Sequence, residues 1–198
     1  MKKLLVTPLL FLIVLASAFG VEAGLELNAL YHYHNTTVQY DNYSYPRTEL
    51  KGGDIDFRVT AKSLFDDSYG VSLYGGATKP LAYQANGVDF HGEGWGWYYG
   101  ANNLLLFDLG YMSQLEFAVG YDTAYQDKGS AEARVDSIRT GLKYNMYDRD
   151  GFFYSLGFEV VFPYYGRIID YGNSDYSSRW FTRGSVIGII FGVGYHTW

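Results

Sequence analysis

The chain has 198 residues, a formal net charge of -6 and no cysteine. The acidic balance argues against nucleic acid as a partner, because phosphate binding needs a basic surface. Without cysteine, the chain has neither a disulfide framework nor the lipid-modified cysteine of a lipoprotein. Its 21 tyrosines and 24 glycines, with only 4 prolines, are far from the composition of helical domains and favour strands.

The N-terminal residues 1–23 predict a cleaved secretory signal peptide. A basic start at Met1-Lys2-Lys3 precedes an apolar run from Leu4 to Phe19, and small residues follow at the cleavage spacing. A cut after Ala18 is the alternative. Beyond this segment no apolar run reaches about 18 residues, so any membrane span must be built from strands. We therefore expect an exported protein whose one domain occupies residues 24–198.

Eight segments of this domain alternate between an apolar face and a face of polar residues and glycine, which is the period of a β-strand. The fourth segment is the least regular, because Leu104 to Phe107 interrupts the alternation and could extend the strand through a bulge. The segments are 25–34, 54–62, 71–77, 94–101, 114–122, 137–144, 152–162 and 187–196.

The apolar faces of the eight segments contain not one Asp, Glu, Lys or Arg. A lysine or arginine facing lipid at the bilayer midplane costs about 2–4 kcal/mol, which explains such a charge-free face. A soluble up-and-down barrel shares the alternation, but these large side chains pointed inward would overfill an eight-stranded barrel. The apolar faces are therefore expected to face lipid.

The connections alternate in length. Long polar stretches at 35–52, 79–92, 126–132 and 164–179 contrast with short turns at 66–68 and 148–151. Long outer loops with short inner turns are the outer-membrane pattern. The predicted fold is all-β: an eight-stranded antiparallel up-and-down transmembrane β-barrel in the bacterial outer membrane, with both chain ends on the periplasmic side.

The chain resembles the small eight-stranded outer-membrane barrels of the OmpA, OmpX and OmpW type over its whole domain. In these proteins an alternating last strand that ends in an aromatic residue is recognised by the barrel-assembly machinery. The resemblance therefore implies outer-membrane lipid and that machinery as partners, with an assembly signal formed by Phe191, Val193, Tyr195 and Trp198. Trp198 is one residue out of phase with the other three, so either Tyr195 serves as the terminal aromatic or a kink near His196 restores the phase.

Charged residues on the inward faces predict a polar network in the lumen, formed by Glu26, Asp56, Arg58, Lys62, Glu116, Arg139, Lys143 and Glu159. A meander places Glu26 near Lys62, Glu116 near Arg139 and Lys143, and Arg139 near Glu159. We favour a packed core that satisfies its own charges over an ion path, because buried charges must be paired. Inward glycines could leave a cavity, but we favour their making room for large neighbours.

His32 and His34 lie on one face of the first segment, with Asp54 across the hairpin. Two such histidines can bind metal, and a histidine with Asp and Ser can serve a lipid-modifying enzyme. The sequence offers no third clustered ligand and no His-x-Ser motif. We therefore expect no catalytic, metal or cofactor site.

The predicted outer loops carry tyrosines among small polar residues, a composition typical of adaptable contact surfaces. An aromatic girdle at the membrane interface is the alternative for these side chains. The sequence favours a structural or surface-interaction barrel whose loops contact an extracellular protein or glycan. A narrow pore or conduit and a lipid-modifying enzyme are the alternatives. The candidate loop residues are Tyr40, Tyr43, Tyr45, Tyr165, Tyr171 and Tyr176.

Overall fold

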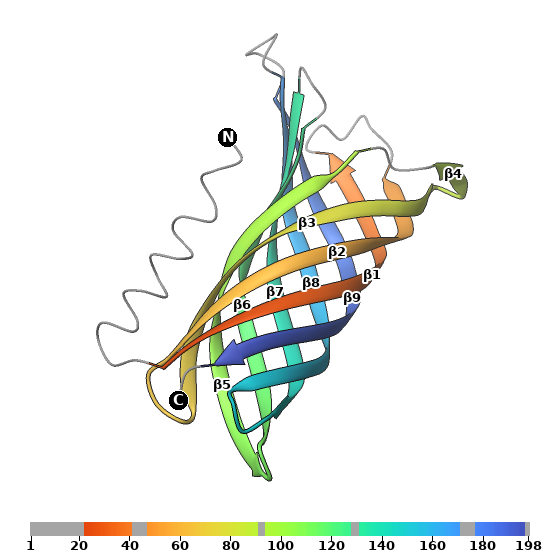
Figure 1. The fold of residues 1–198 in the computed structure, drawn as a ribbon. Coiled ribbons are helices and arrows are strands. Elements are labelled where there is room, and N and C mark those ends of the chain that lie inside the picture. Colours follow the sequence, from red (N-terminus) through yellow and green to blue (C-terminus); the bar gives the residue numbers. More distant parts are fainter. Residues whose placement is uncertain (1–21, 41–46, 91–93, 128–130, 171–176, 197–198) are drawn as a thin grey trace.

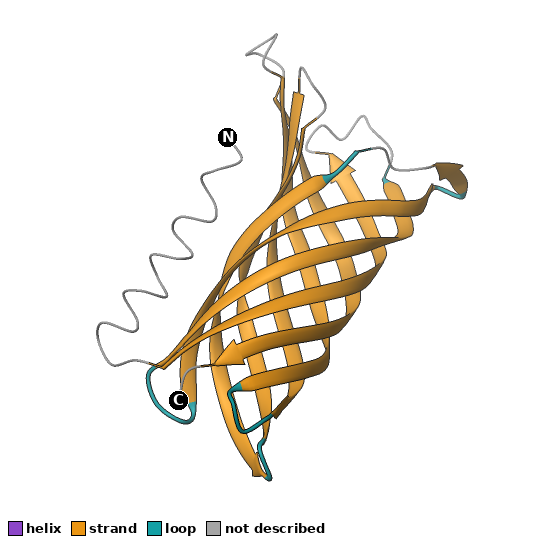
Figure 2. Cartoon of the chain, viewed as in Figure 1, coloured by secondary structure: helices purple, strands orange, loops and turns teal. Residues whose placement is uncertain are grey.

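A computed structural model describes residues 22–40, 47–90, 94–127, 131–170 and 177–196. Every regular element in these ranges is a strand (Figure 2). Within them, no helix is long and apolar enough to cross a membrane. The strands are β1 (Glu22–Tyr40), β2 (Thr48–Leu64), β3 (Tyr69–Ala85), β4 (Val88–Phe90), β5 (Gly96–Gly110), β6 (Ser113–Asp127), β7 (Ala131–Tyr147), β8 (Phe152–Asp170) and β9 (Ser177–His196).

Eight of these strands form a closed antiparallel barrel (Figure 1). Each of these eight pairs with its neighbours along the chain, and β1 pairs with β9 to close the sheet. The short β4 pairs only with the outer part of β3 and stands outside the barrel wall. The predicted eight-stranded up-and-down barrel is therefore confirmed.

The two ends of the barrel differ in their connections. One end, the turn end, has three tight turns, each with an aspartate that accepts backbone N–H groups. Asp66 accepts from Ser68 and Tyr69, Asp108 from Gly110, and Asp148 from Asp150 and Phe152. These hydrogen bonds hold the pKa of the exposed Asp66 carboxyl below its usual value. The opposite end is the loop end, and it corresponds to the cell exterior in the outer-membrane pattern.

At the loop end the strands extend farther than the sequence indicated. The stretches 35–52 and 164–179, predicted as loops, are mostly strand, and the β1–β2 ladder continues to the pair Val38 and Thr48. In the stretch predicted as a loop at 79–92, the described residues 79–90 form a hairpin of β3 with β4. Its turn at Asn86 and Gly87 has positive φ at both residues, as a two-residue hairpin turn requires.

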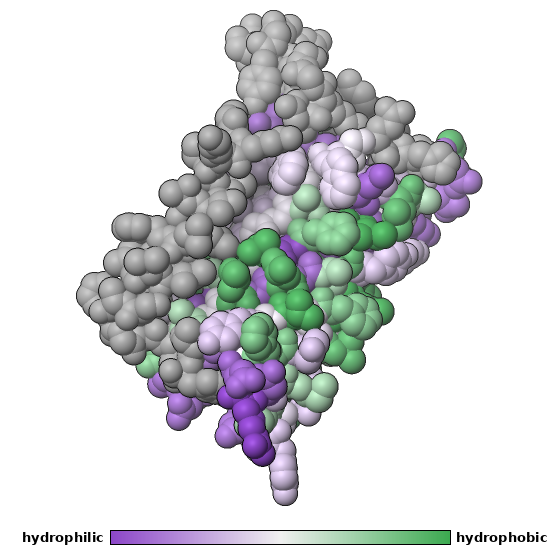
Figure 3. All heavy atoms as spheres, in the orientation of Figure 1, coloured by the Kyte–Doolittle hydropathy of each residue, from purple (hydrophilic) through white to green (hydrophobic). Residues whose placement is uncertain are grey.

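The outer surface of the barrel is apolar. Leu27, Phe57, Leu156 and Phe191 are each more than half exposed. Figure 3 shows hydrophobic side chains gathered over the middle of the visible face, with hydrophilic residues below them at the turn end. So much exposed apolar surface suits a lipid environment and confirms the predicted outward direction of the apolar faces.

The fourth barrel strand, β5, continues through the segment that the sequence marked as irregular. Leu105 and Phe107 are 45% and 51% exposed, whereas Leu104 and Leu106 are buried. The alternation is therefore unbroken, and the bulge lies later, between Asp108 and Gly110. Both faces are apolar here because Leu104 and Leu106 point into the lumen, where they pack with Leu64.

The start of β1 lies inside the segment predicted as a signal peptide. Glu22 and Ala23 pair with Leu64 and Ser63 on β2. Cleavage after residue 23 would remove these two pairs, whereas cleavage after Ala18 would keep them. The cleavage site stays a prediction.

Candidate functional site: the barrel lumen

The structure places all the predicted network residues inside the barrel. Their side chains come from strands on opposite walls and meet in two groups along the barrel axis. Relative exposures run from 0% for Glu26 to 7% for Lys143. The full set is Glu26, Asp56, Arg58, Lys62, Glu116, Arg139, Lys143 and Glu159.

The group nearer the turn end, the turn-side cluster, consists of Glu26, Lys62, Glu116 and Lys143. The Lys62 Nζ lies 2.8 Å from Glu26 and 2.5 Å from Glu116. The Lys143 Nζ lies 2.7 Å from Glu26 and 2.8 Å from Glu116. Each lysine thus bridges both glutamates, and the cluster is neutral. It braces β1 and β2 against β6 and β7 across the lumen.

The group nearer the loop end, the loop-side cluster, is centred on Glu159. Arg58 donates to Glu159 at 2.9 Å, and Arg139 donates to the other carboxylate oxygen. The Arg139 Nε also donates to Asp122 at 2.7 Å. Both guanidinium groups lie over the Tyr74 ring, at 5.2 and 5.6 Å from its centroid, and that of Arg139 also lies over the Tyr98 ring at 5.4 Å. Such cation–π contacts replace part of the hydration that burial removes.

One predicted pairing is wrong in detail. Glu116 contacts Lys62 and Lys143 rather than Arg139, whose partners are Asp122 and Glu159. The direct neighbour of Arg139 on β6 is Gly120, so its long side chain reaches Asp122 diagonally. Asp122 was not among the predicted network residues, and it lies two residues beyond Gly120 on the same inward face of β6.

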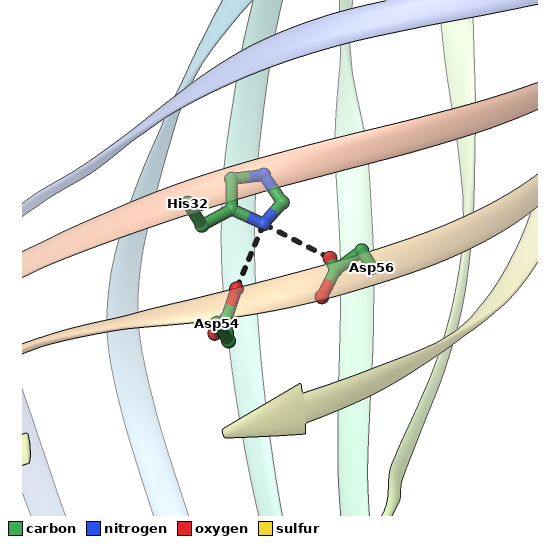
Figure 4. A group of neighbouring side chains, drawn as sticks. All are labelled: His32, Asp54 and Asp56. Carbon is green, nitrogen blue, oxygen red and sulfur yellow. Dashed lines mark hydrogen bonds and ion pairs between the residues drawn. The ribbon is translucent and has the colours of Figure 1, made fainter. Parts of the chain in front are cut away.

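A third feature of the loop side is a histidine surrounded by carboxylates. The His32 Nδ1 lies 3.2 Å from Asp54 and 2.9 Å from Asp56, while its Nε2 lies 2.6 Å from Glu159. His34 contacts the other Asp54 oxygen at 2.5 Å, and the Tyr83 hydroxyl donates to the same oxygen at 3.1 Å. Asp56 is thus the third clustered group that the sequence did not identify (Figure 4).

Apolar side chains and small polar ones such as Asn28, Ser72 and Asn145 fill the rest of the lumen that the structure describes. Leu30 and Ile190, each 2% exposed, face each other on β1 and β9. Leu64, Leu104 and Leu106 pack together at the turn end. A small cavity between the two clusters, lined in part by Arg58, Glu116 and Lys143, has room for a water molecule. The lumen is therefore a packed core.

Several inward glycines lie against large lumen side chains. A Cβ on Gly100 would meet the Tyr74 ring, and one on Gly188 would meet the His32 ring. Neighbouring side chains occupy the space that these glycines provide. This agrees with the prediction that the inward glycines make room for large neighbours and do not leave a cavity.

Two glycines on adjacent strands provide a matched test of this packing. A Cβ on Gly120 would overlap the carbonyl oxygen of Ala101 and lie 2.7 Å from the Cα of Asn102, whereas one on Gly141 would have ordinary contacts of 3.4 Å or more. We expect Gly120→Ala to lower the free energy of unfolding by about 1–3 kcal/mol. Gly141→Ala should have little effect. Urea unfolding in lipid vesicles measures both, and equal stability of the two variants would contradict the packing described.

The predicted loop residues have different positions. Tyr43, Tyr45, Tyr171 and Tyr176 lie outside the described residues. Two placements were wrong: Tyr40 is the last residue of β1, and Tyr165 lies within β8, with its ring 6.2 Å from that of Phe181.

The predicted assembly-signal residues belong to the last strand. Phe191, Val193 and Tyr195 are exposed on the outer face of β9, at 59%, 49% and 45%. Trp198 lies outside the described residues. The signal itself stays a prediction.

Comparison with known proteins supports the architecture. Neither a scan of protein-family models nor a search of curated proteins finds a match. Among solved structures, the outer membrane protein OprG from Pseudomonas aeruginosa is similar, with a TM-score of 0.58, 11% identity, and coverage of 88% of this chain and 95% of that chain. At that identity the likeness shows the fold alone.

Two further structures are similar at lower scores. A major outer membrane protein from Thermus thermophilus has a TM-score of 0.48 and 12% identity, covering 87% of this chain and 99% of that chain. Ail, the attachment invasion locus protein of Yersinia pestis, has a TM-score of 0.43 and 16% identity, covering 89% of this chain and 99% of that chain. With its apolar exterior, the chain has the fold of a small bacterial outer-membrane barrel.

Proposed function

We propose that this protein is an integral outer-membrane barrel that acts as a rigid structural or surface-interaction scaffold, with its contact surface formed by the outer loops. The packed lumen is the observation that carries the proposal. Two ion-paired clusters span the interior, and Leu30 and Ile190 fill space between its walls. A barrel filled in this way has little room for a solute to pass.

The loop end supplies a frame for the contact surface. The β8–β9 ladder extends to the pair Ile169 and Ser177, and the β1–β9 ladder extends to the pair Tyr40 and Trp180. The first and fourth loops therefore leave neighbouring strands of one continuous sheet. Binding residues concentrate on loops held by a rigid frame, and tyrosines among small polar residues suit contact with a protein or a glycan.

The two alternative functions have less support. A conduit needs a passage, and the cavity in the described lumen has room for a water molecule but not for a larger solute. A hydrolytic enzyme needs a nucleophile beside its histidine. Both ring nitrogens of His32 face carboxylates instead.

The test replaces Tyr40, Tyr43 and Tyr45 by Ser. We expect weaker retention of expressing cells on immobilised glycans or extracellular-matrix proteins, because the substitutions remove contact area from the first loop. Barrel stability should be unchanged, because the three residues lie at or beyond the end of β1. The faster migration of unboiled protein on a gel measures folding, since a closed barrel resists detergent.

Planar bilayer recordings provide the opposing test. The folded barrel should show no steady ion conductance. A steady conductance that is blocked by filling the cavity with Gly141→Val, and that is indifferent to the tyrosine substitutions, would favour the conduit over the scaffold.

A further inference from the structure

His32, Asp54 and Asp56 form the most unusual charged group in the described lumen. This group and the loop-side cluster together contain four carboxylates and two arginines. The carboxylates are those of Asp54, Asp56, Asp122 and Glu159, and the arginines are Arg58 and Arg139. Both arginines are directed to Glu159, and Arg139 also binds Asp122. Within the described residues, neither Asp54 nor Asp56 makes an ion pair with a lysine or an arginine. A buried charge needs compensation, and the two aspartates face His32 and His34 in this structure instead of a lysine or an arginine.

The orientation of the His32 ring is fixed by Glu159. An ionised carboxylate only accepts hydrogen bonds, so the Nε2 that lies 2.6 Å from Glu159 carries a hydrogen. Arg58 and Arg139 hold Glu159 in place. This arrangement, in which a carboxylate accepts from one ring nitrogen and leaves the other for an ion, is the one that orients metal-binding histidines.

The Nδ1 of His32 then faces two aspartate oxygens at once, at 2.9 Å and 3.2 Å. A lone pair there would be repelled by both oxygens, and a single N–H can point well at only one of them. Two ligands of a tetrahedral zinc ion are about 3.3–3.6 Å apart when each lies about 2.0–2.2 Å from the metal. The observed separations are a few tenths of an ångström shorter, so an ion could be shared after a small outward movement of the two carboxylates.

The Asp56 carboxylate supplies an independent observation. Its side chain is 5% exposed, and its buried Oδ1 accepts no hydrogen bond from any residue that the structure describes. Buried acceptors are nearly always satisfied, so this oxygen indicates a missing partner. Figure 4 shows Asp56 and Asp54 projecting from β2 toward the same nitrogen of His32 on β1, and the three ligand atoms lie within 4.8 Å of one another.

We propose that His32, Asp54 and Asp56 bind a divalent transition-metal ion of the zinc type. One nitrogen and two carboxylate oxygens give three protein ligands, and the fourth position of a tetrahedral site remains for water. The ion neutralises the two aspartates and ties β1 to β2 near the loop end. His34 supports the site through the second oxygen of Asp54. This inference is independent of the scaffold proposal.

The experiment titrates the folded chain in detergent, without an added histidine tag, with Co²⁺ and then Zn²⁺. One Co²⁺ per chain should bind and produce a visible absorption band, and Zn²⁺ should remove that band by displacing Co²⁺. Asp56→Asn and His32→Gln should each weaken binding by at least about tenfold, because each removes a ligand. His196→Gln is the matched control. It removes another buried histidine, which pairs with Gly24 on β1, about 26 Å from His32 along the strand.

Imidazole nitrogen NMR of the unmodified protein gives a readout that does not depend on the variants' folding. Zn²⁺ should shift the Nδ1 resonance of His32 far more than its Nε2 resonance. Failure to bind Co²⁺ or Zn²⁺ at one ion per chain would overturn the proposal, as would binding that survives both ligand substitutions. The contacts of the two aspartates with His32 and His34 would then belong to the packed lumen and not to a metal site.

Discussion

Replacing Arg139 by Met is expected to lower the free energy of unfolding by about 3–5 kcal/mol, the usual cost of removing one partner from a buried ion pair. Arg139 is 6% exposed and donates to Asp122 and Glu159. Glu159 keeps Arg58 and His32 after the substitution. Asp122 loses its only ion pair with a described residue. Most of the loss should therefore come from Asp122.

The second substitution identifies the partner. Arg139→Met with Asp122→Asn should recover more stability than Arg139→Met with Glu159→Gln, because only the first neutralises a carboxylate that has lost its cation. Urea unfolding in lipid vesicles, followed by tryptophan fluorescence, gives the coupling free energies from the two double-mutant cycles. Equal recovery by the two partners, or greater recovery with Glu159→Gln, would show that the assignment to Asp122 is wrong.

The alternation of side chains was sufficient to predict the barrel, because the membrane excludes charge from one face of every strand. The strands could not be predicted from the sequence where this exclusion of charge no longer applies. Residues 35–40 and 48–52 are mostly polar, with Val38 and Leu50 among them, so these parts of the strands show no alternation between an apolar and a polar face. The alternation was not recognised at Leu104 to Phe107 for the opposite reason, because the inward-facing Leu104 and Leu106 make both faces of the strand apolar.

The side-chain contacts in the lumen could be predicted from the sequence only in part. Direct cross-strand neighbours such as Glu26 and Thr60 follow from a simple meander, and the contact of Glu26 with Lys62 lies one step along the same face. The pairing of Arg139 with Asp122 and the approach of Asp56 to His32 have the same diagonal relation as Glu26 with Lys62. Each inward residue has more than one diagonal neighbour, and strand tilt and side-chain length decide which of them it contacts. The candidate metal site was missed for that reason.

The other large effect concerns the turn-side cluster. Replacing both Lys62 and Lys143 by Met leaves Glu26 and Glu116 buried without a cation, because each glutamate has these two lysines as its ion-pair partners. We expect the double variant to yield little folded barrel at neutral pH. Each single variant should be milder, since the remaining lysine still bridges both glutamates. The loss in the double variant should therefore exceed the sum of the single losses.

Adding Glu26→Gln and Glu116→Gln to the double variant tests whether charge or volume is responsible. The four substitutions keep similar side-chain sizes while removing every charge from the cluster, and neutral replacements of buried ion pairs are often tolerated. Folding should return, measured as the fraction of unboiled protein that migrates rapidly on a gel after dilution from urea into detergent. If the double variant folds as well as the single losses predict, the four residues do not act as one unit. If the fourfold variant stays unfolded while the double does too, the lysines contribute more than the neutralisation of Glu26 and Glu116, for example the cation–π contact of Lys62 with the Phe153 ring at 5.0 Å.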